Sequence, residues 1–243
     1  MKRLGFIIPL IVVLVAFTAD NASSILAKVD KNMLAIKDKT AEVEMQMINL
    51  KNGSKKVKKA MLYQKGLDKK LFRYTYPDSD KGIASLTIPG AVYLYLPMFK
   101  KPKKVTNMAQ GNTFNKSDFS LEDMVTKPYS ELYTPKLIKT TDKAFILDLT
   151  PKDPDNSSYS HLVATINKVH YYPEKFEYYD KKNQKVKEAV NDYVKIDNYW
   201  IAQTVTMTNL KKNHKTIFTM KNIKINTGLK DDLFTVENMV EKE

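Results

Sequence analysis

The chain has 243 residues, no cysteine, and 40 Lys and Arg against 27 Asp and Glu, which gives a formal charge of +13. Without cysteine, no disulfide can hold the fold and no lipid can be attached to an N-terminal cysteine, so a hydrophobic core must supply the stability. The charge fits a nucleic acid, an anionic membrane surface or a Lys-rich solvated surface, but no helix-turn-helix, RNP-like or zinc-finger pattern is present, so we expect no nucleic-acid partner.

Residues 1–22 are predicted to be a secretory signal peptide. Lys2 and Arg3 precede an almost wholly apolar run over 4–19, and small residues such as Ala22 follow. The run is short for a membrane-spanning helix, which needs ~20 apolar residues, although an uncleaved anchor is the alternative. We therefore expect export to the periplasm as a soluble protein, with residues 23–243 as one domain.

The exported part begins with a predicted amphipathic helix and continues as a series of hairpins. Apolar residues recur at helical spacing over 23–38, with Ser23 and Ser24 as candidate caps. From Thr40 onward, apolar and polar residues alternate, and turn signals separate the runs. Strands are predicted over 43–47, 57–63, 71–76, 83–88, 91–96, 104–109, 143–149, 162–171, 174–180, 184–190, 199–209 and 214–226.

This order of elements predicts the fold class. Many short strands in hairpin order, without a strand–helix–strand rhythm, indicate a large antiparallel sheet. Only seven glycines are present, which disfavours tight barrel closure by glycine kinks. The predicted fold is mainly β (α+β), a half-open, strongly curved antiparallel β-barrel covered by a few α-helices.

Residues 72–124 carry a series of short motifs. An aromatic strand ends at Tyr76-Pro77, and Lys81-Gly82 follows. The next strand ends at Tyr95-Leu96-Pro97, and a lysine-rich loop leads to the acidic segment Ser117 to Asp123. Near the end of the chain stand Trp200 and Leu233-Phe234-Thr235.

In its order and spacing, this series resembles the outer-membrane lipoprotein-sorting family, the relatives of the periplasmic lipoprotein carrier LolA, from about Ile25 to Met239. The resemblance implies a half-open barrel with an apolar cavity, in which close relatives hold the acyl chains of a lipoprotein. It implies lipid or lipoprotein acyl chains as cargo, an inner-membrane exporter of the RND or ABC type and an outer-membrane acceptor as partners, transient membrane contact, and no cofactor.

One departure from the family pattern concerns the loop after Tyr-Leu-Pro, where the family usually has arginines. This chain has only lysines there, which lack the bidentate fork of arginine. Specific recognition of a phosphate by the loop is therefore not expected, whereas general attraction to an anionic membrane is. The membrane-facing basic residues are Lys100, Lys101, Lys103 and Lys104.

The strand over 91–96 is apolar on both faces, so we expect both faces to be covered. It is either ordinary core or a strand with one face lining a lipid cavity, and the sequence does not decide which face. The 11 methionines suit a cavity filled by flexible chains, or they fill gaps in a core. The candidate cavity residues are Val92, Leu94, Leu96, Tyr93, Tyr95, Met45, Met47, Phe72 and Tyr74.

A short helix is predicted over 117–125, and with the helix at 23–38 it forms the candidate lid. Ser117 or Asp118 would cap it, and Glu122 or Asp123 would reach back to free backbone amides. We prefer structural capping to a functional role for this motif, which comprises Ser117, Asp118, Phe119, Glu122 and Asp123.

We predict no catalytic and no metal site. The sequence has no Gly-x-Ser-x-Gly elbow and no nucleophilic cysteine, and His161, His170 and His214 lack metal-ligand spacing. The leading hypothesis is therefore a non-enzymatic lipid carrier. Two alternatives stay open: a periplasmic sensor or structural module that binds a partner protein through its sheet edge or basic loop, and an envelope hydrolase whose Ser, His and carboxylate are gathered by folding.

Overall fold

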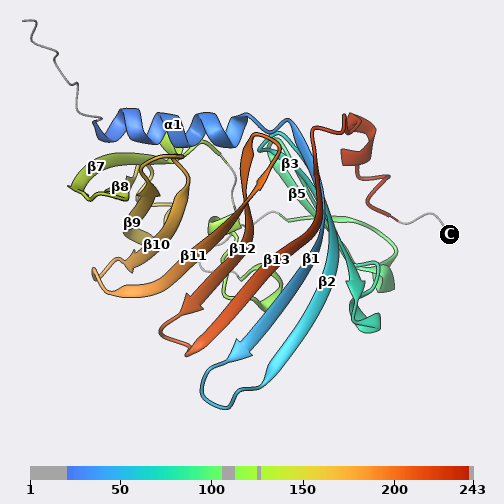
Figure 1. Cartoon of the computed structure of the whole chain (residues 1–243). Helices are drawn as coiled ribbons and strands as arrows, with labels where there is room; N and C mark the ends of the chain where they lie inside the picture. The colour runs from blue at the N-terminus through green and yellow to red at the C-terminus, as the bar shows by residue number, and fades with distance from the viewer. Residues whose placement is uncertain (1–20, 106–112, 125–126, 241–243) are drawn as a thin grey trace, which may run out of the picture.

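The computed structural model describes residues 21–105, 113–124 and 127–240 (Figure 1). Thirteen antiparallel strands form one sheet in the order β6-β5-β4-β3-β2-β1-β13-β12-β11-β10-β9-β8-β7. The last strand, β13, lies between β1 and β12. It therefore joins two runs of consecutive hairpins: β1 to β6, which we call the first half of the sheet, and β7 to β12, the second half. The predicted signal peptide lies outside the described residues except for its last two positions.

The described residues form two helices, α1 (Ala22–Leu34) and α2 (Tyr129–Leu132), and five 3₁₀ turns: η1 (Asp78–Asp80), η2 (Pro97–Phe99), η3 (Phe114–Lys116), η4 (Glu122–Met124) and η5 (Asp231–Phe234). The strands are β1 (Asp38–Asn49), β2 (Lys55–Lys65), β3 (Lys69–Tyr76), β4 (Ala84–Ile88), β5 (Ala91–Tyr95), β6 (Lys103–Lys104), β7 (Tyr133–Thr140), β8 (Ala144–Pro151), β9 (Tyr159–Asn167), β10 (Pro173–Asp180), β11 (Lys185–Ile196), β12 (Tyr199–Asn209) and β13 (His214–Ile225).

The sheet is strongly curved and unclosed, which confirms the predicted half-open architecture (Figure 1). β12 and β13 pair only between Thr204–Asn209 and His214–Thr219. Both strands continue beyond this stretch without pairing to each other, so the two halves of the sheet diverge there. α1 lies across the end of the sheet at which they diverge (Figure 1).

One predicted strand ends earlier in the structure, one strand of the structure was not predicted, and one predicted strand lies mostly outside the described residues. The strand at 162–171 ends at Asn167, whose side chain accepts hydrogen bonds from the backbone amides of Val169 and His170 and so begins a turn. β7 was not predicted; it contains Pro135, which a strand tolerates at the edge of a sheet. The strand at 104–109 falls mostly on 106–112, outside the described residues.

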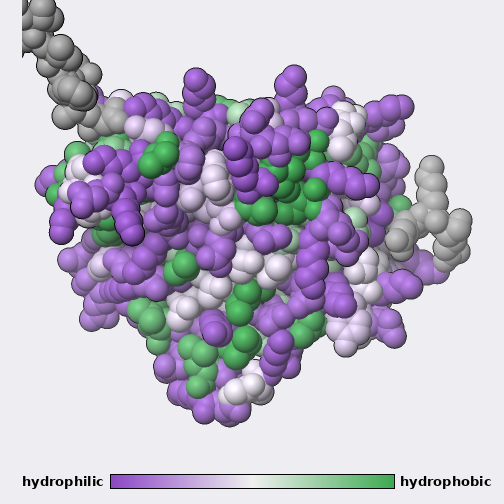
Figure 2. Space-filling view, viewed as in Figure 1, coloured by the Kyte–Doolittle hydropathy of each residue, from purple (hydrophilic) through white to green (hydrophobic). Residues whose placement is uncertain are grey.

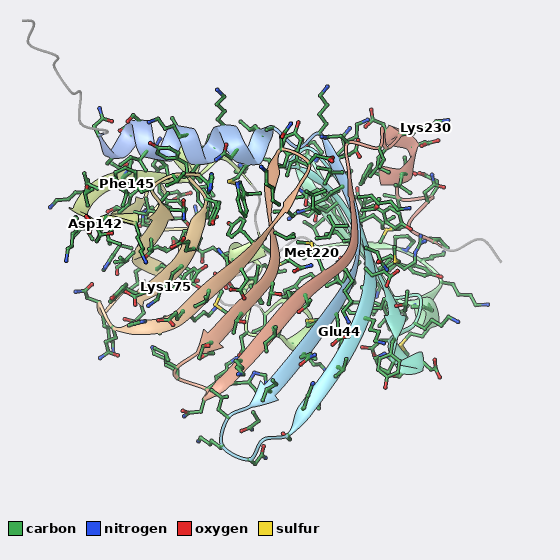
Figure 3. All side chains as sticks on the ribbon, in the orientation of Figure 1. Glu44, Asp142, Phe145, Lys175, Met220 and Lys230 are labelled. Carbon is green, nitrogen blue, oxygen red and sulfur yellow. The ribbon has the colours of Figure 1, made fainter. Side chains whose placement is uncertain are left out.

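α1 covers the second half of the sheet. Asn21 caps it, since its Oδ1 accepts a hydrogen bond from the Ser24 amide at 2.8 Å, so the predicted caps Ser23 and Ser24 lie inside the helix. Its apolar face packs on a core that includes Phe145, beneath α1 in Figure 3. The buried Asp30 accepts hydrogen bonds from the amides of Tyr129 and Ser130, which fixes the short helix α2 against α1.

The strand register gives the first half of the sheet two distinct faces. Leu71, Leu86 and Tyr93 stand directly opposite one another on β3, β4 and β5, so their side chains share one face. This outer face is covered by the C-terminal segment, whose Phe234 and Met239 are buried against it. The other face of these strands turns toward the inside of the curved sheet.

The C-terminal segment is held at its start by Asp38. Burial would raise the pKa of this carboxyl, but hydrogen bonds from Thr227, Gly228 and Leu229 outweigh burial and hold its pKa below the ordinary value. The Thr227 amide donates at 2.7 Å and the Gly228 amide at 2.9 Å. The outer face is therefore covered by a segment that is distant in sequence from β3, β4 and β5 and is held in place by these hydrogen bonds.

Candidate functional site

The inside of the curve carries an apolar surface, which we call the inner face. It is built where apolar positions of β1, β2 and β3 alternate toward the interior, and β13 adds to it, because Val43 is opposite Met220 and Met45 opposite Phe218. Met220 is labelled in Figure 3. The buried members of the inner face are Val43, Met45, Met47, Ala60, Phe72 and Tyr74. Its partly buried members include Leu62, Ile83, Phe218 and Met220.

A segment of the chain itself covers the inner face. We call residues 113–124 the plug segment. Its Phe114 ring meets Phe72 edge-on with 5.7 Å between centroids, and its Phe119 ring meets Phe218 edge-on at 4.9 Å. The Phe114 amide donates to the Phe119 carbonyl at 2.8 Å, so the two rings are presented by one closed loop.

The first polar anchor of the plug segment is Asp118, which is only 2% exposed. Its Oδ2 accepts a hydrogen bond from Thr216 Oγ1 at 2.7 Å and lies 2.6 Å from His214 Nδ1. The Asp118 amide also donates to Thr216 Oγ1, at 3.0 Å. Asp118 is therefore tied to β13 and does not cap a helix as predicted.

The second anchor is a reciprocal pair between Ser120 and Asp123. The Ser120 amide donates to Asp123 Oδ2 at 2.7 Å, and the Asp123 amide donates to Ser120 Oγ at 3.1 Å. This is a capping box, but it surrounds the 3₁₀ turn η4. The predicted helix over 117–125 is therefore wrong, and Ser117 instead donates its hydroxyl to the Phe114 carbonyl.

The acidic pair of the plug segment reaches the other half of the sheet. Asp123 is in an ion pair with Lys187 on β11 at 2.8 Å and accepts a hydrogen bond from Tyr159 Oη on β9, also at 2.8 Å. Burial, followed by the Asp123 charge, raises the pKa of Tyr159. Glu122 accepts hydrogen bonds from Ser157 Oγ at 2.5 Å and from the Ser158 amide at 3.0 Å. The plug segment thus bridges both halves of the sheet.

The register assigns the predicted cavity residues of β5 to opposite faces. Leu94 stands opposite Ser85, which stands opposite Phe72, so Leu94 points to the inner side. Val92 and Leu96 share its parity along the chain. Tyr93 and Tyr95 lie in the outer cluster with Phe234 and Met239, which corrects their assignment to the cavity. The remaining candidates, Met45, Met47, Phe72 and Tyr74, lie on the inner face.

The predicted basic loop is exposed and also carries apolar side chains. Met98 is 80% exposed and Phe99 49%, next to the exposed Lys100 and Lys101. The Lys103 ammonium lies 4.6 Å from the centroid of the Phe99 ring. Lys103 and Lys104 form β6 at one edge of the sheet. The loop therefore combines apolar tips with positive charge, and the sequence pattern had drawn attention only to the charge.

Two lysines of the inner side were not singled out from the sequence. Lys39 on β1 and Lys70 on β3 are partly buried. Burial lowers the pKa of Lys39 to about 8. Burial, and then repulsion by Lys39, lowers the pKa of Lys70 to about 7. In a chain with so many lysines, no local pattern marks the two whose side chains turn inward. Their placement on the same side of the sheet depends on strand register.

A groove of about 470 Å³ lies elsewhere, beside α1. Aromatic rings line it, and the Trp200 and His170 rings are 4.8 Å apart between centroids. Lys28 and Lys195 also line it. Because it lies away from the inner face, it is not the apolar cavity that the sequence predicted.

Ser160, His161 and Asp148 lie close together but lack the geometry of a hydrolase triad. Ser160 Oγ lies 3.1 Å from His161 Nδ1, but this hydroxyl also donates to the Tyr179 carbonyl. His161 Nε2 is 3.7 Å from Asp148, which is too long for the hydrogen bond that orients a catalytic imidazole. Among residues 21–105, 113–124 and 127–240, no group of three or more His, Cys, Asp or Glu is placed to hold a metal ion.

Among the residues that the structure describes, none of the helices has the length and apolarity that crossing a bilayer requires.

Comparison with known proteins places the chain in a family. A family model described as an uncharacterized protein matches residues 66–241. No curated protein matches the sequence. An outer membrane lipoprotein-sorting protein domain from Vibrio parahaemolyticus is 27% identical, with a TM-score of 0.77 over 88% of this chain and 96% of that one.

Two further solved structures share the fold. A DUF1329 family protein from Desulfovibrio piger is 21% identical, with a TM-score of 0.80 over 91% of this chain and 100% of that one. A LolA superfamily protein from Nitrosomonas europaea is 19% identical, with a TM-score of 0.73 over 89% of this chain and 98% of that one. The chain therefore belongs to the family of the matching model, and it has the LolA-like fold of these solved structures.

Proposed function

We propose that this protein is a non-enzymatic carrier that binds the acyl chains of a lipoprotein or another envelope lipid on the inner face. The observation that carries the proposal is the plug segment, whose Phe114 and Phe119 rings cover the inner face without adding a strand to the sheet. A segment that is held by side-chain hydrogen bonds and an ion pair can leave the apolar surface, and a flexible acyl chain can then cover it. The family relationship supports the same role.

The apolar contributions of the two occupants are comparable. Burying a phenylalanine side chain contributes ~1.5–3 kcal/mol, and burying one CH₂ group contributes ~0.8 kcal/mol. About four to eight methylenes therefore match the two rings of the plug segment. A single long acyl chain can displace them, while the competition keeps the net affinity moderate. A carrier needs this balance, because its cargo must leave again at an acceptor.

The wider setting follows from this proposal. The protein acts in the periplasm after removal of its signal peptide, as one domain over 23–243. An inner-membrane exporter of the RND or ABC type supplies the cargo and an outer-membrane acceptor receives it. The loop with Met98, Phe99 and its lysines makes transient contact with anionic membranes, since apolar tips and positive charge both favour that surface.

The test is uptake of a fluorescent fatty-acyl probe, together with mass spectrometry of lipids extracted from the protein expressed with export. Leu94→Asp puts a charge on the inner side and should abolish uptake. Leu50→Asp is the matched control, because Leu50 is 47% exposed at the β1–β2 turn and should leave uptake unchanged. A folded Leu94→Asp variant that binds the probe normally would contradict the inner face as the cargo site.

An empty protein that also fails to take up the probe would instead favour the partner-binding module. In that case a protein partner whose binding weakens with salt should be found at the basic loop or the sheet edge.

A further inference from the structure

The inner face ends in a row of residues that contains two lysines. The row crosses six strands, and directly opposite residues share a face, so its members turn to the inner side together with Phe72 and Ala41 two positions further on. Neighbouring strands lie ~4.8 Å apart, which sets the two lysine Cα atoms about 10 Å from each other. The row consists of Ile225, Lys39, Gln64, Lys70, Thr87 and Val92.

No carboxylate balances these two charges within the described residues. The row itself has no acidic member, and Lys70 Nζ donates only to the Met124 carbonyl, at 3.2 Å. Asp38 precedes Lys39 but points to the opposite face, where Thr227 and its neighbours occupy both oxygens. Protonation of both amines therefore places two partly buried charges on the inner side that repel each other, which is unfavourable until an anion joins them.

Another lysine on the inner side shows what a balanced charge looks like. Lys58 stands opposite Met45, and its ammonium lies 2.7 Å from Asp80. Lys39 and Lys70 differ from Lys58 in that no carboxylate of the described residues pairs with them.

The position of the pair suits the head of an amphiphile. Along β1, Lys39 is followed on the same face by Val43 and Met45, about 13 and 20 Å away at ~3.3 Å per residue. Charge at one end and an apolar strip below it match a lipid. Lys39 stands five positions after Leu34, the last residue of α1. Figure 2 shows apolar residues gathered in the part of the view in which Figure 1 draws β3 and β5.

We propose that Lys39 and Lys70 bind the phosphate of an anionic lipid headgroup while the acyl chains of that lipid take the inner face. This inference rests on the proposed function and narrows its cargo to a lipid whose phosphate headgroup carries a net negative charge. Because lysine acts as a point charge, the site selects negative charge more than headgroup shape. The phosphate also competes with the Met124 carbonyl for Lys70, so loading releases one contact of the plug segment.

The experiment compares two fluorescent lipids of equal chain length, a labelled phosphatidylglycerol and a labelled phosphatidylcholine, by equilibrium binding to the purified protein. We expect phosphatidylglycerol to bind at least about tenfold more tightly, as two charge-assisted contacts imply. The double variant Lys39→Gln with Lys70→Gln should lose this preference and keep the phosphatidylcholine affinity, which also shows that it is folded. Lys58→Gln is the matched control and should keep the preference.

The outcomes separate the two proposals. Equal binding of both lipids to the unchanged protein, or a preference that survives in the double variant, would overturn the headgroup site and leave the carrier intact. Binding of neither lipid would overturn the carrier as well. Inorganic phosphate is added as a competitor: failure to displace the lipid at millimolar concentration supports a lipid headgroup, whereas displacement in the micromolar range would assign the pair to the free ion and overturn the lipid assignment.

Discussion

At the scale of single residues, the buried carboxylate of Asp118 holds the plug segment to β13. Asp118→Ala would leave the Thr216 hydroxyl and the His214 ring without their buried acceptor. We expect the free energy of unfolding to fall by about 2–4 kcal/mol, since hydrogen bonds to a buried charge are lost and their partners stay desolvated. Urea unfolding measures this change. Asp142→Ala at an exposed turn is the control, and an equal loss there would argue against the anchor.

The low pKa of Lys70 predicts a dependence of stability on pH. Its pKa is about 7 in the folded protein against an ordinary 10.5, so the unfolded chain binds more protons between these values. The contribution of Lys70 to stability therefore rises as the pH increases from about 7 toward 10.5, and below pH 7 its full penalty is present. Lys70→Met should be stabilising at pH 6.5, and this advantage should shrink at pH 9.5, measured by urea unfolding at both values. An advantage independent of pH would contradict the pKa shift.

At the scale of elements, the proposed function makes the plug segment a competitor of cargo for the inner face. Phe114→Ala removes the ring that rests on Phe72 and Phe218, so the segment binds its site less tightly. We expect affinity for an acyl probe to increase about three- to tenfold while stability falls, because removing a buried phenylalanine costs up to 3–5 kcal/mol and this ring is only partly buried. Unchanged affinity in a destabilised variant would mean that cargo does not need the site of this ring.

The same scale shows what the sequence could and could not predict. The alternation over 91–96 predicted the strand β5, but both of its faces are apolar, so only the pairing with β4 and the cover by Phe234 separate Leu94 from Tyr93. The helix over 117–125 was wrong although Ser120 and Asp123 carry the spacing of a capping box, since that motif also closes a 3₁₀ turn. Contacts such as that of Asp118 with Thr216, 98 positions apart, have no local signal.

The exposed loop after β5 makes a separate prediction. Replacing Met98 and Phe99 together by serine should weaken binding to vesicles that contain anionic lipid, because the apolar tips no longer enter the interface. Cosedimentation at two salt concentrations separates the apolar contribution to vesicle binding from the electrostatic one, since the remaining lysines still bind the vesicles at low salt. Vesicle binding that is unaffected by the replacement would assign membrane contact to another surface.

At the scale of the whole molecule, the two halves of the sheet are joined by pairing between β12 and β13 and by the plug segment, which reaches β13 through Asp118 and β11 through Asp123. If the inner face holds cargo as proposed, loading removes the second connection but not the first. Loading is therefore a local exchange of occupants within a sheet that stays folded, and not an unfolding of either half.

Hydrogen exchange tests this exchange directly. In the empty protein the amides of Ser120 and Asp123 donate to side chains within the plug segment and should be protected. With saturating phosphatidylglycerol we expect these amides to exchange faster, while amides of β1, β2 and β3 exchange more slowly because the cargo covers them. Protection that persists in the plug segment of a loaded protein would place the cargo off the inner face, and slower exchange beside Trp200 would then point to the aromatic groove. The direction of change in one segment thus decides which of the two concave surfaces holds the lipid.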